Sequence, residues 1–484
     1  MKQILLYKTR MGNFESGIVH AAMQLKKLIY ALVLTGLLVS CDRDELLNFA
    51  PYGVTTPETT ADFRLLMNQK SGMFGSGTSG WASSYSIDRV LTDDIKVPDG
   101  FATEYLSTYK SRFYGALTWS ESIGLLEEND EDWGGLYNNI QTAHLIIEKV
   151  VDPNVSGRED EKQQIVAECK VQRAYAYFSL VNLYSKQYDA ATAKDDLGVP
   201  IRTNSTMSGP TPRQSVQAVY DVILQDLKEA IESESLEKSH TEMNWQVTEA
   251  AAYGLRARVN LQMGNFADAL SDASKTLELY KKPILDLSTI SVYPFNYDNE
   301  EIILLKEYRT NMPENSVYAA DELIALYEAN DLRLEWRFEE DIVIGGYEFV
   351  FQPGRYQPRL CYTGISVPEM YLIRAECIAR LDGDLTQAIS DLNTLRVNRY
   401  ATGTYVDLTS AELPDAPTTL AFVKEERRRE LADRGMRWFD LKRYNAYDKA
   451  NITIIRIIDG EVVTLEPNSN GWIVPLVPKV SKWL

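Results

Sequence analysis

Apolar residues recur at helical spacing along most of the chain. One face of a first expected helix carries Trp133, Leu136, Ile140, Ala143 and Ile147. Comparable amphipathic runs extend over about 160–185, 216–230, 247–263, 266–280, 319–329, 367–381, 385–399 and 417–433. Apolar positions three and four residues apart are typical of helices that bury one face. The pattern therefore predicts a mainly α-helical fold.

One segment of this helical pattern is repeated within the chain. The sequence GNFADALSDA at 264–273 recurs 119 residues later as GDLTQAISDL at 383–392. In each copy one helix is expected to end at the glycine, and a small alanine allows the next helix to pack closely against it. Tetratricopeptide helix pairs are built in this way. With further pairs at 133–185 and 214–263, the sequence predicts about four divergent helix pairs in a scaffold that covers roughly 60–400.

Other segments do not follow helical spacing. Residues 71–122 are rich in Gly, Ser and aromatic side chains, which predicts long loops over the scaffold. Two β-hairpins are expected, one at Asp341–Phe351 around Gly345-Gly346 and one at Ile452–Leu465 around Asp459-Gly460. We therefore expect residues 401–484 to form a mixed α/β region with a C-terminal hairpin, packed against the helices.

The N-terminal segment has the organisation of an export signal. Two lysines, Lys26 and Lys27, precede 12 apolar or small residues at 28–39, and Cys41 follows. A membrane-spanning helix needs about 20 residues, so this run is too short to span. The parts are those of a signal peptide. Residues 1–40 are therefore expected to be a leader, with the signal peptide at 23–40, and 41–484 the mature chain.

The break before Cys41, Leu-Val-Ser-Cys, resembles a lipobox, at which a bacterial lipoprotein is cut and its cysteine acylated. We expect Cys41 to be the lipidated N-terminus, carrying palmitate among its acyl chains. The acidic residues that follow it resemble the signals that send such lipoproteins to the outer face of the outer membrane.

Charge and composition exclude several function classes. The chain has 50 Lys and Arg against 69 Asp and Glu, a net charge of −19, and removing the leader makes it more negative. A surface of this sign repels nucleic acid. After Cys41 the chain retains three cysteines at unrelated spacings and two histidines: Cys169, Cys361, Cys377, His144 and His240. We therefore expect no disulfide framework, no metal site and no cofactor.

Three polar features suggest chemistry, and for each of them we favour a structural role. The run EERRRE at 425–430 is predicted to form a salt-bridge network, in which Arg429 can pair with Glu425 and with Asp433 at helical spacing. The adjacent acids at 93–94 point to opposite sides of an extended segment, unlike the separated pair of a glycosidase. They are predicted to cap or close a loop, with calcium binding as another role. His144, on an apolar helix face, is predicted to be a core histidine.

Aromatic residues in loops suggest where a ligand binds. Sugar rings lay their C–H faces on aromatic rings, and polar side chains select their hydroxyls. Trp81 and Tyr85 lie in one expected loop, and Tyr293, Phe295 and Tyr297 lie in another between two helices. Each of them could instead be buried in the core. We expect at least one of the five to line a ligand site.

An ordered set of motifs resembles the SusD/RagB family of surface lipoproteins. The motifs follow the lipobox in family order and are DWGGLYNNI (132–140), RAYAYFSL (173–180), LGVP (197–200), RQSV (213–216), PEMYLIRAE (368–376), ERRREL (426–431) and GMRWFDLKR (435–443). The resemblance covers nearly the whole mature chain.

This resemblance implies a tetratricopeptide-like fold that caps a SusC-like TonB-dependent barrel and holds an oligosaccharide for import without catalysis. It places the ligand site where the early loops meet the loop after the third helix pair, around Trp81, Tyr85, Tyr293 and Phe295. Some family members take up peptides, so the chain could capture oligopeptides with the same architecture. An envelope scaffold and an exported glycosidase fit the sequence less well.

Overall fold

The computed structural model describes the parts of the chain from which the fold is built. These are residues 57–68, 84–85, 87–97, 111–120, 129–206, 211–240, 243–307, 318–339, 355–356, 362–481 and 484. Glu58–Leu484 form one compact unit, and all that follows concerns this unit. Cys41, Trp81 and the hairpin expected at Asp341–Phe351 lie outside the described residues.

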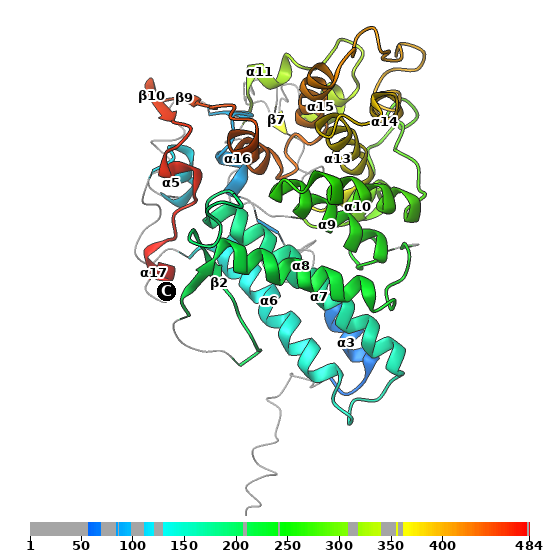
Figure 1. The fold of residues 1–484 in the computed structure, drawn as a ribbon, viewed down its shortest axis with the longest axis vertical. Coiled ribbons are helices and arrows are strands. Elements are labelled where there is room, and N and C mark those ends of the chain that lie inside the picture. The colour runs from blue at the N-terminus through cyan, green and yellow to red at the C-terminus, as the bar shows by residue number, and fades with distance from the viewer. Residues whose placement is uncertain are drawn as a thin grey trace, which may run out of the picture. The chain divides into compact units, whose positions relative to one another are not determined.

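Helices dominate the unit (Figure 1). The longer ones are α6 (Glu131–Val150), α7 (Glu159–Tyr184), α8 (Val216–Glu232), α9 (Glu249–Met263), α10 (Phe266–Leu279), α13 (Val367–Arg380), α14 (Leu385–Arg396), α15 (Ala416–Glu430) and α16 (Arg437–Tyr447). The shorter ones are α3 (Thr60–Met67), α5 (Ser111–Leu117), α11 (Asp321–Ile324), α12 (Arg333–Arg337) and α17 (Pro478–Ser481), with 3₁₀ turns η1 (Ile87–Val90), η3 (Asn296–Asp298) and η5 (Asn470–Trp472).

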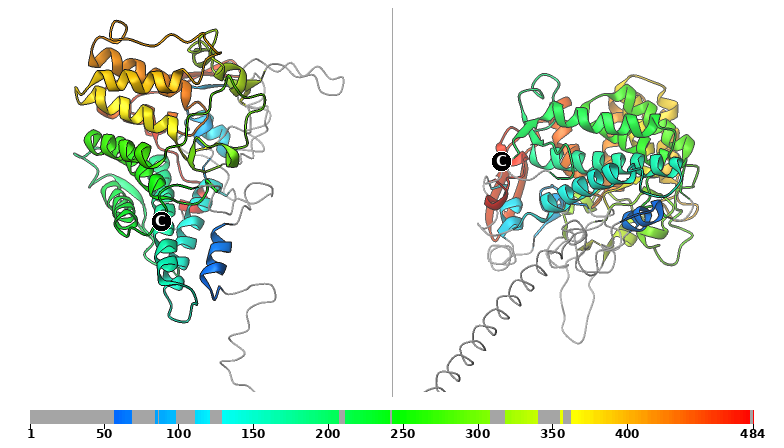
Figure 2. Two further views of the ribbon diagram at one scale, coloured as in Figure 1. Left: turned by 90° about the vertical axis from the view of Figure 1, so that its right-hand side faces the viewer. Right: turned by 90° about the horizontal axis from the view of Figure 1, so that it is seen from below.

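The long helices pack mostly on their neighbours in sequence. Helix α6 packs on α7, α7 on α8, α8 on α9, α9 on α10, α10 on α13, and α13 on α14 and α15. Figure 2 shows the same succession from the side, with α13–α15 in a layer next to α9 and α10. Each pair buries a face that it cannot cover alone, as in tetratricopeptide arrays. The predicted helical-repeat fold is confirmed, and the helical packing continues past residue 400.

The first copy of the repeated sequence ends its helix at the expected glycine. Helix α9 starts at Thr248, whose side chain accepts a hydrogen bond from the amide of Ala251, and ends at Gly264 with φ of +78°. Glycine adopts this left-handed conformation without a steric cost. Ala269 in α10 and Ala388 in α14 are both fully buried. These alanines lie in the close helix–helix contacts of the two copies.

The strands are short and all pair antiparallel. One sheet has the order β1 (Ile95–Lys96), β5 (Tyr318–Ala319), β7 (Arg355–Tyr356) and β6 (Phe338–Glu339). Three two-stranded pairs join β2 (Leu197–Pro200) to β3 (Arg213–Ser215), β4 (Ile302–Leu304) to β8 (Ile365–Ser366), and β9 (Ile454–Ile458) to β10 (Glu461–Leu465). The last pair is the expected C-terminal hairpin, turning at Asp459 and Gly460, both with positive φ.

Two segments differ from the sequence expectation. The helix expected at 319–329 is reduced to the four residues of α11. Ala319 is taken up by β5 and the amide of Ala320 donates to the carbonyl of Asp94, and after Ile324 the chain continues in turns. The segment 71–122, expected to be loop, contains η1, β1 and α5 in its described parts. Val90 of η1, Leu117 of α5 and Trp119, which follows α5, belong to the main core.

Helix α7 is buried along most of its length, among α6, α8 and the C-terminal segments. Helices that are covered on all sides have little amphipathic pattern. Of the helices in the described parts of the chain, none combines the length and apolar character that crossing a membrane requires.

Candidate functional site

Four aromatic side chains from two separate segments form two ring pairs, Phe295 with Tyr297 and Tyr293 with Trp336. Because Tyr293 and Phe295 belong to one loop, we call the four residues together the aromatic cluster. The rings of Phe295 and Tyr297 are stacked almost parallel, with centroids 5.3 Å apart. Tyr293 lies 6.1 Å from Trp336 of α12. Phe295 is 47% exposed, and the other three are half-buried. An exposed large aromatic ring on a loop is the expected chemistry for holding a sugar face.

The loop that carries three of these rings is held at Leu287 and at Asn296, on either side of Tyr293 and Phe295. The amide of Leu287 donates to the carbonyl of Asn398, and the side chain of Asn244 donates to the carbonyl of Asn296. Tyr297 packs with Trp245 against a small core of Ile302, Leu305 and Tyr362. The rings are therefore presented by an ordered backbone.

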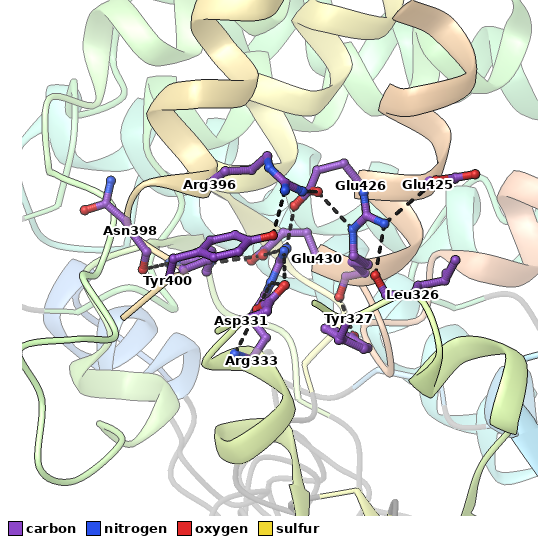
Figure 3. Close-up of polar contacts among 12 residues, drawn as sticks. Leu326, Tyr327, Asp331, Arg333, Arg396, Asn398, Tyr400, Glu425, Glu426 and Glu430 are labelled. Carbon is purple, nitrogen blue, oxygen red and sulfur yellow. Dashed lines mark hydrogen bonds and ion pairs between the residues drawn. The ribbon is translucent and has the colours of Figure 1, made fainter. Parts of the chain in front are cut away.

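Helix α12, which carries Trp336, is held by a buried charged network (Figure 3). Arg333 is fully buried and forms ion pairs with Asp331 at 2.7 Å, Glu426 at 2.6 Å and Glu430 at 2.9 Å. A helix of five residues has little stability of its own. The Arg333 pairs therefore fix the position of Trp336 relative to α15.

The same network reaches the neighbouring helices. Arg396 of α14 and Arg429 of α15 both contact Glu426, and Arg399 joins Glu430 to Glu301 at the start of β4. Burial disfavours the charge on Glu426, but Arg333, Arg429 and Arg396 outweigh it and lower the pKa of Glu426 to about 2. The carboxylate remains charged at any pH at which the protein works.

Arg434 connects this network to the aromatic cluster. Its guanidinium lies 3.8 Å from the centre of the Tyr362 ring. Burial disfavours the charge, but the nearby Tyr362 and Tyr293 outweigh burial and raise the pKa of Arg434. Sequence reasoning missed both Arg434 and Trp336. Trp336 belongs to a helix too short to show periodicity, and Arg434 follows a run of arginines that looks purely structural.

The structure corrects the assignment of Tyr85 to a ligand-binding surface. Tyr85 is only 1% exposed, its hydroxyl donates to the carbonyl of Gly435 at 3.0 Å, and its ring packs against Phe439. Gly and Ser around it suggested an open loop, but the residue anchors that segment to the core. Phe295 and Tyr297 stack on each other and Tyr293 pairs with Trp336, whereas Trp81 lies outside the described residues. That these residues line a ligand site stays a prediction.

The predicted salt-bridge network of residues 425–430 is confirmed. Arg429 lies 3.8 Å from Glu425, as the spacing suggested. The expected pairing of Arg429 with Asp433 is wrong. Helix α15 ends at Glu430, before Asp433, and Asp433 pairs instead with Arg89 at 2.8 Å.

The adjacent acids at 93–94 close a loop, as predicted. Arg437 forms a bidentate pair with Asp93, and Arg428 bonds Asp94 at 2.6 Å. Despite burial, Arg437 and Arg428 lower the pKa of Asp93 to about 2. Both carboxylates are thus committed to arginines that tie this segment to α15 and α16.

His144 is the core histidine that the sequence predicts. Its Nε2 donates to the carbonyl of Arg202 at 2.9 Å, and its Nδ1 accepts from Arg173 at 3.1 Å. Burial and the nearby Arg173 charge lower the pKa of His144 to about 4. Within the described ranges no three His, Cys, Asp or Glu side chains are grouped as metal ligands would be.

Comparison with known proteins identifies the family. Residues 92–261 match a SusD-like family model described as "starch-binding associating with outer membrane", and residues 367–480 match the SusD family model. Together the two segments make up more than half of the chain. The chain belongs to the SusD/RagB family.

Relatives and solved structures agree with this family assignment. A SusD-like protein, P38, of Formosa agariphila is 23% identical over 386 residues, which cover 65% of this chain and 72% of the relative. A SusD superfamily structure from Bacteroides thetaiotaomicron superposes with a TM-score of 0.66 at 18% identity, covering 88% of this chain and 97% of the other. A laminarin-binding SusD-like protein superposes with a TM-score of 0.55 at 19% identity, covering 82% and 92%. These structures share the fold of the chain.

Proposed function

We propose that this SusD/RagB protein is a cell-surface lipoprotein that binds an oligosaccharide at the aromatic cluster and delivers it to a SusC-like TonB-dependent transporter. The observation that carries the proposal is the exposed Phe295 ring stacked on Tyr297, beside Tyr293 and Trp336. Rings held by a fixed backbone lose little conformational entropy when a sugar binds, which favours affinity. Trp81 is proposed to belong to the same site.

Family membership supports the location and the partner. A family model described as associating with the outer membrane matches 92–261, and the lipobox-like Cys41 offers a lipid anchor. Two or more acyl chains give stable anchoring, at about 0.8 kcal/mol per buried CH₂. Replacing Cys41 with Ala is expected to release the protein from the outer-membrane fraction. Retention of the variant there would contradict lipid anchoring.

We also propose that the protein does not catalyse a reaction on its ligand. The adjacent acids at 93–94, the pair that the sequence offered for glycoside hydrolysis, are engaged by Arg428 and Arg437. Incubation of the purified protein with a glycan panel is expected to leave every glycan intact. Release of reducing ends that one carboxylate substitution abolishes would establish a glycosidase instead.

A panel of neutral oligosaccharides and a panel of oligopeptides test the ligand class by calorimetry. Phe295→Ala is expected to weaken oligosaccharide binding by about 1 kcal/mol or more, the scale at which binding anchors stand out. Because the ring is 47% exposed, the melting temperature should change little. Tyr293→Ala and Trp81→Ala, measured in the same way, test whether these residues share the site.

Val406→Ala is the matched control, since Val406 is 81% exposed in the loop that follows α14. It should bind as the parent does. Unchanged affinity in folded Phe295→Ala, Tyr293→Ala and Trp81→Ala alike would refute the site. Binding of peptides in place of sugars, lost in the same variants, would keep the site and change the ligand class.

The transporter partnership is tested by affinity isolation from detergent-solubilised membranes. We expect a TonB-dependent receptor to copurify with the full chain. Repeated isolation without such a receptor would favour an envelope scaffold.

A further inference from the structure

A second concave site lies at the beginning of α6, and it shares no residue with the aromatic cluster. This pocket has a volume of about 630 Å³. Three segments form its walls: the first turns of α6, the chain around β2 and β3, and α17. Its lining includes Trp133, Gly134, Tyr137, Arg202, Thr211 and Lys479. We call it the α6 pocket.

Two aromatic rings form one wall of the α6 pocket. Trp133 and Tyr137 have ring centroids 4.8 Å apart, and Trp133 also packs edge-on against Tyr184. The hydroxyl of Tyr137 donates to the carbonyl of Pro200 at 2.7 Å, which fixes the ring. Trp133 is only 9% exposed, so the half-buried Tyr137 ring is the part of this rigid wall that a sugar face can cover.

Arg202 brings a positive charge to this wall, and its backbone is held on both sides. Its amide donates to the hydroxyl of Tyr177 at 2.8 Å, and its carbonyl accepts from His144. Its guanidinium donates to the hydroxyl of Thr211 at 3.2 Å and lies 6.0 Å from the Tyr137 ring.

In the part of the chain that the structure describes, no carboxylate lies within ion-pair distance of Arg202. Its neighbour Arg173 differs, because it forms a bidentate pair with Asp226. Lys479, also at the pocket, donates to the amide oxygen of Asn129. Both cations of the α6 pocket thus have neutral partners in a chain that is acidic overall, and an incoming anion can pair with them.

One of the two acidic side chains at the pocket, Asp130, is already paired with a cation. The carboxylate of Asp130 accepts bonds from Tyr184 and pairs with Arg112 at 2.9 Å. Glu131 is exposed at the rim. Arg202 and Lys479 are therefore the cations that an anionic ligand would meet, with Glu131 and the terminal residue Leu484 at the same pocket.

Gly134 supplies an independent indication that something approaches α6 here. A glycine inside a helix costs roughly 1 kcal/mol relative to alanine. Gly134 is exposed, its φ is ordinary, and a Cβ added to it would meet no atom within 4 Å. Neither packing nor backbone conformation requires glycine, so the bare backbone leaves room at the pocket floor.

We infer that the α6 pocket binds a saccharide residue that carries an anionic group, a uronate carboxylate or a sulfate ester. Arg202 and Lys479 hold the anion, and Tyr137, backed by Trp133, packs against the sugar ring. The choice of a saccharide rests on the proposed function. The inference adds to it a second site that selects acidic sugars.

Calorimetry on the purified chain tests the inference with three probes: tetragalacturonate, its uncharged methyl ester, and a tetrasaccharide of neutral sugars that carries a sulfate ester. At least one charged probe is expected to bind tenfold or more tightly than the ester, and the stronger one identifies the anion. Arg202→Met should reduce the affinity of the protein for this charged probe to its affinity for the methyl ester. Lys228→Met removes an exposed charge on α8 and should leave binding unchanged.

Gly134→Leu gives a second variant that does not depend on charge. It should lower the affinity for the charged probe at least tenfold. The melting temperature should stay the same or rise, since leucine favours the helical conformation more than glycine does. Equal affinity for all three probes, or unchanged affinity in Arg202→Met and Gly134→Leu, would overturn the inference. Either of these results would leave the proposed function standing, provided that neutral glycans bind and that Phe295→Ala weakens their binding. Conversely, failure of neutral glycans to bind would not affect the charge-dependent binding at the α6 pocket.

Discussion

The helix pairs α9–α10 and α13–α14 are two copies of one design with different surroundings. In the first, Arg256 makes a bidentate pair with Asp272, at 2.9 and 2.7 Å. In the second, Arg374 makes the same pair with Asp391, at 2.8 and 2.6 Å. A tyrosine three residues before each arginine lies under its guanidinium. The repeat seen in the sequence is thus also a repeat of a charged brace between two helices.

The two pairs differ in the loops that follow them. The loop after α10 carries Tyr293 and Phe295, whereas the loop after α14 carries Tyr405, whose hydroxyl is bonded to Asn393 of α14 itself. Phe295 in the first loop is exposed, whereas Tyr405 in the second is hydrogen-bonded to the helix before it. The repeat therefore sets the position of a loop, and the residues of the loop determine whether a ligand can bind there.

Removing the brace should have the largest effect and should be similar in the two copies. Arg256→Met and Arg374→Met each leave a buried aspartate without its cation. Breaking such a pair is expected to lower the free energy of unfolding by about 3 kcal/mol. Urea unfolding of each variant measures this loss. A loss of less than about 1 kcal/mol in both would show that the pairs do not brace the repeat.

Substitution of the glycine at the end of α9 should lower the free energy of unfolding by a smaller amount. Gly264→Ala places a Cβ in left-handed backbone, 3.1 Å from the Tyr447 ring, and should cost about 1–2 kcal/mol. Gly403→Ala is the control, because Gly403 has φ of +73° but open space around it. Thermal unfolding of the two variants separates backbone strain from the clash with Tyr447. A smaller loss for Gly264→Ala than for Gly403→Ala would contradict the role of that contact.

A third version of the brace, Arg173 with Asp226 between α7 and α8, differs because a histidine joins it. The pKa of His144 is about 4 in the fold against an ordinary 6.5, so the unfolded chain binds more protons between these values. The stability from neutral His144 is complete above pH 6.5 and is lost as the pH falls towards 4. We expect a loss of about 1–2 kcal/mol between pH 7 and pH 5.

His144→Gln keeps a hydrogen-bonding side chain but removes the titration. The loss of unfolding free energy between pH 7 and pH 5 should shrink in this variant, as followed by urea unfolding at each pH. The neighbouring charges of Arg173, Glu148 and Asp226 are retained, so they remain as background. An identical pH dependence in parent and variant would contradict the assignment to His144.

Local patterns were sufficient to predict much of the scaffold. Helical spacing located α9, α10, α13 and α14 within a few residues, and Asp459-Gly460 located the C-terminal hairpin. Helix α7 was found as well, although burial on all sides removes most of its amphipathic pattern. The expected helix at 319–329 starts late because β5 pairs with β1, a contact between distant segments, and it ends early in turns after Ile324.

The candidate site was predictable only in part. Tyr293, Phe295 and Tyr297 are close in sequence and could be grouped by inspection. Trp336 joins them through Arg333, whose partners Glu426 and Glu430 lie 93 and 97 residues further along the chain. No local pattern reveals such a contact. Tyr85 shows the converse, since a loop-like composition conceals a buried hydroxyl bonded to Gly435.

The smallest expected effect tests a difference between the helix ends of the two copies. After α9 the left-handed residue is Gly264, whereas after α13 it is Asp382, with φ of +49°, one residue before the glycine that the repeat aligns with Gly264. Asp382 is exposed, and its substitution disturbs no packing. Asp382→Gly should therefore raise the free energy of unfolding by about 0.5 kcal/mol, because glycine adopts left-handed backbone without the Cβ penalty. Thermal unfolding checks the sign. A loss of stability would mean that the aspartate has a role at this helix end that its backbone conformation does not explain.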